Sequence, residues 1–152
     1  MSDRLSAAER QQLDEIGFVV LPDFFLDLLD PLRKRIEEIF AEEGERAGSE
    51  FRQEPGCRRL ANLVDKGTIF QQVISNSRIL SYVAYVLGPR FKLSSLNARS
   101  VNPLWTEPQP LHADMAAVTD EAGNWVCNVV WMIDDISAEN GPIRAIPGSH
   151  RL

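Results

Sequence analysis

Two side chains in this sequence, His112 and Asp114, have the types and the spacing of a metal-binding pair. They stand at positions i and i+2, and alternate side chains of an extended segment point to the same face. An imidazole and a carboxylate side by side are two of the three ligands in the facial two-histidine, one-carboxylate arrangement. That arrangement holds Fe(II) and leaves positions open for a bidentate cosubstrate and O₂. Taken alone, the tripeptide is also typical of a hydrogen-bonded pair at a protein surface.

The first part of the chain, about residues 1–90, has mainly helical patterns. Ser6 and Glu9 have the spacing of a capping box, in which each side chain satisfies an N–H group at a helix start. Gly17 ends that helix, and Phe18–Leu21 is expected to be a short strand. A second helix is expected from about Asp30-Pro31, with an apolar stripe of Leu32, Ile36, Ile39 and Phe40. Residues 44–58 are expected to form a loop. A further helix is expected over Ser77–Leu87, with a buried face of Ile79, Leu80, Val83, Ala84 and Leu87.

The second part, about residues 91–152, has the pattern of short strands separated by turns. Strands are expected at Phe91–Val101, Trp125–Ile133 and Ile143–Ile146. The run Trp125–Ile133 is almost wholly apolar, which is typical of a strand covered on both faces. Several short strands with turn signals between them favour a sandwich or jelly roll. The sequence therefore predicts a single α+β domain over residues 1–152, with N-terminal helices packed on a jelly-roll or cupin-like double-stranded β-helix.

Several motifs, in order, resemble the phytanoyl-CoA dioxygenase family of Fe(II)- and 2-oxoglutarate-dependent dioxygenases. QPLHAD at 109–114 resembles its Leu-His-x-Asp motif, Trp131 stands in the following apolar strand, and NGPIRAIPGSHR at 140–151 resembles its Asn-Gly-Pro … Pro-Gly-Ser-His signature. GFVVL at 17–21 and VLGP at 86–89 also fit. The resemblance covers essentially the whole chain and is most specific in its last third.

The resemblance implies that His112 and Asp114 are the first two iron ligands and that Trp131 lies beside 2-oxoglutarate. Trp131 is equally expected as an ordinary core residue. Asn97 and Arg99, on one face of the strand before the motif, are candidates for lining the cosubstrate pocket. The implied cofactors are Fe(II), 2-oxoglutarate and O₂, and the implied reaction is hydroxylation of a small organic or acyl substrate. The carboxylate of Asp114 favours hydroxylation, because halogenating relatives carry a small residue there.

His150 is the other histidine, and in the family the histidine of this turn is not the distal iron ligand. A hydrogen bond that stabilises the turn is the expected role. The distal histidine and the arginine that binds 2-oxoglutarate are expected beyond Leu152. The sequence is accordingly expected to hold about the first half of the β-helix and to be inactive alone.

Two alternatives stay open. The chain could be a short binding or assembly module without catalysis, whose open sheet edges pair with a partner chain or a second copy. It could also be a small cupin-like metal protein that uses His112, Asp114 and His150 together, in which case replacing His150 would abolish metal affinity.

Composition limits the class of protein. Hydrophobic residues make up 44% and charged residues 25% of the chain, the balance of a globular protein. The net charge of −6 argues against a nucleic-acid partner or an anionic membrane surface. Cys57 and Cys127 lie outside any CxxC pattern and are expected to be reduced thiols, and neither a signal sequence nor a membrane-spanning stretch is visible. The expected compartment is the cytoplasm, and the expected partner is a small-molecule substrate.

Overall fold

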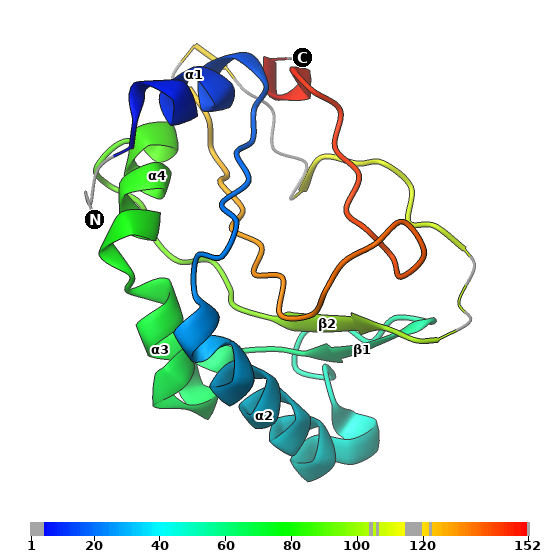
Figure 1. Ribbon diagram of the computed structural model, residues 1–152. Coiled ribbons are helices and arrows are strands. Elements are labelled where there is room, and N and C mark those ends of the chain that lie inside the picture. Colours follow the sequence, from blue (N-terminus) through cyan, green and yellow to red (C-terminus); the bar gives the residue numbers. More distant parts are fainter. Residues whose placement is uncertain (1–4, 104, 106, 115–119, 122, 152) are drawn as a thin grey trace.

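The computed structural model describes residues 5–103, 105, 107–114, 120–121 and 123–151 (Figure 1). Helices and a small sheet make up its regular structure, so the predicted α+β class is confirmed. The helices are α1 (Ala7–Glu15), α2 (Leu26–Glu43), α3 (Thr68–Ile74) and α4 (Ser77–Leu87), the strands are β1 (Cys57–Leu60) and β2 (Ala98–Val101), and short 3-10 turns lie at Gly44–Arg46, Leu63–Lys66 and Ser149–Arg151.

Helix α1 begins as the sequence predicts. The Glu9 N–H donates to the Ser6 hydroxyl at 3.2 Å, and the Ser6 N–H donates to the Glu9 carboxylate at 2.7 Å. Both halves of the capping box are therefore formed. At the other end, Gly17 has φ +90°, and a Cβ there would collide with the ring of His150. This close approach requires glycine.

Helix α2 begins earlier than the sequence predicts, at Leu26 rather than near Asp30, so that Pro31 lies inside it. Leu28 packs against the core, which extends the apolar face of the helix by a turn. Because Pro31 has no N–H to donate to the carbonyl four residues earlier, the helix lacks one backbone hydrogen bond there.

The main core lies where α2 packs against segments that the sequence did not single out. The apolar stripe of α2 is buried as predicted. Its partners come from β1, the 3-10 turn at Leu63–Lys66 and α3, and the buried cluster consists of Leu32, Ile36, Ile39, Phe40, Leu60, Leu63, Phe70 and Val73. Helix α4 buries Ile79, Tyr82 and Val83, so only part of its predicted apolar face is fully enclosed.

Strands β1 and β2 pair antiparallel, with Leu60 opposite Ala98 and Arg59 opposite Arg99. Because strand side chains alternate, Leu60 and Ala98 lie on one face and the two arginines on the other. Leu60 has no exposed surface and joins the core. Its face holds the sheet against the helices, while the opposite face presents charged groups.

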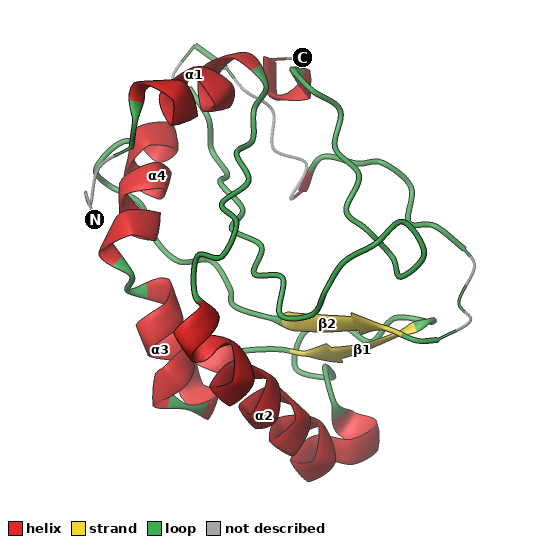
Figure 2. Cartoon of the chain, in the orientation of Figure 1, coloured by secondary structure: helices red, strands yellow, loops and turns green. Residues whose placement is uncertain are grey.

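Several predicted strands are wrong. The predicted strand Phe91–Val101 is confirmed only at its end, as β2, and Phe91–Asn97 runs as a loop. Strands are absent at Phe18–Leu21, Trp125–Ile133 and Ile143–Ile146, which also run as loops (Figure 2). Nor is the 125–133 run covered on both faces, since Trp125 is 64% and Val130 58% exposed. A strand requires a neighbouring backbone to complete its hydrogen-bonding ladder. Within the described residues, β1 and β2 are the strands that pair in such a ladder. A jelly roll is not seen there.

None of the described helices is long and apolar enough to cross a bilayer. Cys57 and Cys127 are free thiols, as expected.

Candidate metal-binding site

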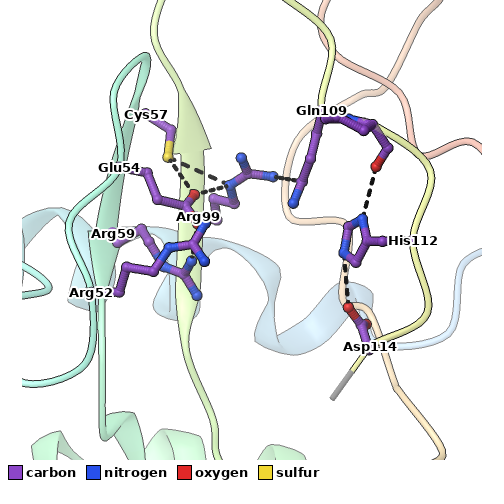
Figure 3. Close-up of polar contacts among 9 residues, drawn as sticks. Arg52, Glu54, Cys57, Arg59, Arg99, Gln109, His112 and Asp114 are labelled. Atoms are coloured by element: carbon purple, nitrogen blue, oxygen red, sulfur yellow. Dashed lines mark hydrogen bonds and ion pairs between the residues drawn. The ribbon is translucent and has the colours of Figure 1, made fainter. Parts of the chain in front are cut away.

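The structure brings the two predicted ligands together. The His112 Nε2 lies 3.0 Å from the Asp114 Oδ1, and the other ring nitrogen, Nδ1, lies 2.8 Å from the Pro110 carbonyl oxygen (Figure 3). Both side chains are about half exposed, at 49% and 53%. The imidazole is thus held at both nitrogens, with Nε2 turned toward the carboxylate.

This geometry suits a metal ligand. A histidine that donates its Nδ1–H to a backbone carbonyl presents Nε2 as the coordinating atom, which is the usual supporting arrangement around metal-bound histidine. The Pro110 carbonyl, and then the Asp114 carboxylate, raise the pKa of His112 above its usual value because they favour the doubly protonated ring. A metal ion bound at Nε2 would replace the proton that this nitrogen shares with Asp114.

Asn128 fixes the second oxygen of the carboxylate. Its side-chain amide donates to the Asp114 Oδ2. Asp114 therefore has one oxygen held by an amide and the other turned to the imidazole. A contact of this kind orients a carboxylate toward its partner.

The two candidates for the cosubstrate pocket, Arg99 and Asn97, differ in their hydrogen-bond partners. Arg99 lies on β2 and donates from Nη1 to the Gln109 Oε1 at 2.8 Å, which places it next to the segment that carries the motif (Figure 3). Asn97 directly precedes β2 and donates locally to the Ser95 hydroxyl at 3.3 Å. Of these two candidates, Arg99 contacts the motif segment.

Trp131 is half-buried against the edge of the core. Its ring meets Phe25 edge-on, with centroids 4.8 Å apart, and Phe24 at 6.1 Å. These contacts are those of a packed aromatic, which is one of the two roles expected for it.

His150 connects the 3-10 turn at Ser149–Arg151 with the end of α1. Its Nε2 lies 3.1 Å from the Asp14 carbonyl oxygen, at the end of α1. Among the described residues no group of three or more His, Cys, Asp or Glu side chains is placed to hold a metal ion, so His150 does not join the pair. The expected hydrogen-bonding role of His150 therefore fits the structure, with the partner on α1 rather than within its own turn.

The donor set nevertheless fits Fe(II). A neutral imidazole nitrogen and a carboxylate oxygen are ligands that this ion accepts, and they stand at hydrogen-bonding distance with both outer atoms held. Two protein ligands leave the remaining coordination positions to other groups.

A large cavity is lined in part by Asn128, whereas neither His112 nor Asp114 lines it. It has a volume of about 1530 Å³, and its walls come mainly from apolar residues of 17–29 and 126–136. Asn128, which holds Asp114, is one of the lining residues, so the cavity reaches the neighbourhood of the carboxylate.

Three residues of this site were not predicted from sequence. The sequence offered a reason to single out Asn128, because it is the one amide in the otherwise apolar run Trp125–Ile133. It also offered one for Gln109, which stands between two prolines just before the motif. Glu54, which contacts Arg99 at 3.0 Å, lies in a loop rich in charged residues and could not have been distinguished there.

The fold and the site define an α+β protein with a histidine–carboxylate pair suited to a divalent metal. A family model described as phytanoyl-CoA dioxygenase (PhyH) matches residues 13–152. The chain belongs to the phytanoyl-CoA dioxygenase family, and this membership indicates the oxygenase class of enzymes. Comparison with curated proteins and with solved structures gave no significant match.

Proposed function

We propose that this protein is a non-haem Fe(II)- and 2-oxoglutarate-dependent dioxygenase that hydroxylates a small organic or acyl substrate, with His112 and Asp114 as iron ligands. The observation that carries the proposal is the 3.0 Å approach of the His112 Nε2 to the Asp114 Oδ1 in a chain of this family. Iron bound there with 2-oxoglutarate and O₂ would supply the oxidising chemistry for an unactivated C–H bond.

The chain's own residues orient the ligands. The Pro110 carbonyl holds the Nδ1 side of the ring, and Asn128 holds the outer oxygen of Asp114. Such supporting contacts fix the direction in which each ligand points. The Asp114 carboxylate supplies an oxygen ligand, and its presence favours hydroxylation over halogenation.

Arg99, Asn97 and Trp131 are proposed to line the cosubstrate pocket. Arg99 supports this best, because its guanidinium lies beside the motif segment and can pair with a carboxylate in two parallel hydrogen bonds. In the double-stranded β-helix that the family implies, all three would face one pocket. The apolar walls of the 1530 Å³ cavity next to Asn128 suit an organic or acyl substrate.

The test is Co(II) binding by the purified protein, with Co(II) as a stable substitute for Fe(II). We expect His112→Ala and Asp114→Ala each to lower the affinity for Co(II) by about 100-fold or more, because even residues that only support a ligand change it about 10–100-fold. His150→Ala should leave Co(II) affinity unchanged. Equal Co(II) binding by His112→Ala and wild type would overturn the proposal.

A binding module without catalysis is the second candidate. The exposure of Val130 and Ile143, each 58%, favours it, because exposed apolar side chains are typical of interaction surfaces. This candidate predicts a stable dimer or complex in solution. A monomer by light scattering that forms succinate would eliminate it.

A further inference from the structure

Glu54 lies between two arginines that face each other across the sheet. Arg59 on β1 is the direct partner of Arg99 on β2, and like charges directly opposite each other destabilise a strand pair. The carboxylate of Glu54 joins them: its Oε1 lies 2.6 Å from the Arg59 Nη1 and its Oε2 lies 3.0 Å from the Arg99 Nε.

The environment of Glu54 makes these pairs stronger than surface ion pairs. Its side chain is only 7% exposed, so water screens the charges little. Arg52 also contacts its Oε1, and the Cys57 thiol donates to its Oε2 at 3.2 Å. Burial raises the pKa of Glu54, but the thiol and the three guanidiniums together outweigh it, so the net pKa lies below its usual value.

Arg99 extends from this cluster to the metal-binding pair. Its Nη1 donates to the Gln109 Oε1 at 2.8 Å, and the next residue, Pro110, contributes the carbonyl that holds the His112 Nδ1 at 2.8 Å (Figure 3). The Gln109 carbonyl in turn accepts from the Arg144 Nη2 at 2.9 Å. The Gln109-Pro110 dipeptide is therefore held on one side by arginines and on the other by the ligand histidine.

We propose that Glu54 is a positioning residue for the metal-binding pair: by fixing Arg99, it sets the Gln109-Pro110 dipeptide and through it the orientation of the His112 ring. This inference rests on the proposed function. Metal ligation needs its ligands held to within about 0.5 Å. Residues that support a ligand directly change metal affinity about 10–100-fold. Glu54 acts through further links, so a loss of about threefold to tenfold is expected.

The experiment titrates the full chain with Co(II) and follows the visible absorption of the bound ion. Glu54→Gln and Gln109→Ala should each weaken binding about threefold to tenfold. Glu37→Gln is the control, because Glu37 also pairs with an arginine of β1, Arg58 at 2.7 Å, but at an exposed position (54% for its side chain) and without contact to Arg99. Its Co(II) affinity should equal that of wild type.

A double-mutant cycle separates positioning from a general loss of structure. If Glu54 acts through Gln109, then Glu54→Gln should add little to the loss already caused by Gln109→Ala. Independent, additive losses would overturn the inference. Should Glu54→Gln fail to fold in a thermal melt, the exposed Gln109→Ala decides alone, and unchanged Co(II) affinity in that variant overturns it.

The His112→Ala variant distinguishes the two proposals. If it binds Co(II) like wild type, the metal site itself is elsewhere and both proposals fail. If it loses Co(II) while Glu54→Gln and Gln109→Ala bind like wild type, the proposed function stands and only the role of Glu54 is overturned.

Discussion

Glu9, in the first turn of α1, accepts a hydrogen bond from the Tyr82 hydroxyl at 2.6 Å and contacts the Arg78 guanidinium at 3.2 Å. Both partners belong to α4, so this one carboxylate connects two helices. The Tyr82 hydrogen bond, followed by the one from the Ser6 backbone, lowers the pKa of Glu9 from 4.5 to about 2. All of these groups favour the ionised carboxylate over the protonated one.

The pH dependence of stability follows from this depressed pKa. Glu9 contributes its full stabilisation above the unfolded value of 4.5, and the contribution is lost as the pH falls toward about 2. After discounting for solvent screening, it is on the order of 1 kcal/mol. Urea unfolding between neutral pH and pH 2 should show Glu9→Gln losing less stability on acidification than wild type. Glu45→Gln, an exposed site, should follow wild type, and parallel curves for Glu9→Gln and wild type would contradict the prediction.

Strand β1 is the element on which the core and the site both depend. One face carries Leu60 into the cluster under α2, and the other carries Arg59 toward Glu54 and Arg99. A single strand of four residues therefore couples helix packing to the placement of β2 and Arg99. Its register determines which side chains face which way, and a slip of one residue would exchange the two faces.

Leu60→Ala should destabilise the protein by about 3 kcal/mol, because it removes a fully enclosed side chain and leaves a cavity. Leu93→Ala is the control, since Leu93 is 52% exposed and its loss should cost less than about 1 kcal/mol. Denaturant unfolding measures both. Equal losses in the two variants would show that β1 is not anchored through Leu60.

At the scale of the whole molecule, Arg33 joins the helical part to the segment beyond the motif. From α2 it donates to the Ile133 carbonyl at 2.6 Å and to the Asp134 carboxylate at 3.0 Å. Trp131, two residues earlier, packs on Phe25. In the absence of a ladder, side-chain contacts of this kind hold the 126–136 segment against the helices along one wall of the cavity.

Arg33→Gln should loosen that segment without unfolding the core. Amide hydrogen exchange in residues 130–136 should become about fivefold faster, equivalent to ~1 kcal/mol, the net contribution of a typical intramolecular hydrogen bond. Lys34→Gln is the matched control, because Lys34 is the neighbouring cation and its side chain is 79% exposed. Unchanged exchange in Arg33→Gln would mean that the aromatic packing alone holds the segment.

Short-range sequence patterns determined the helix start, the buried helix face and the helix bounds that could be predicted for this protein. The capping box at Ser6 and Glu9, the stripe of α2 and the bounds of α4 could be predicted because each depends on neighbours within a few residues. The closeness of His112 and Asp114 likewise followed from their i, i+2 spacing. Their role as iron ligands stays a prediction.

What only the tertiary structure decided depends on partners distant in the chain. Trp125–Ile133 has the composition of a buried strand, yet it forms none, because composition does not supply a neighbouring backbone to pair with. Glu54 could not be distinguished from the other charged residues of its loop until the fold placed it between Arg59 and Arg99. Periodicity specifies an element and its buried face, whereas the meeting of side chains from separate segments is determined by how those elements pack.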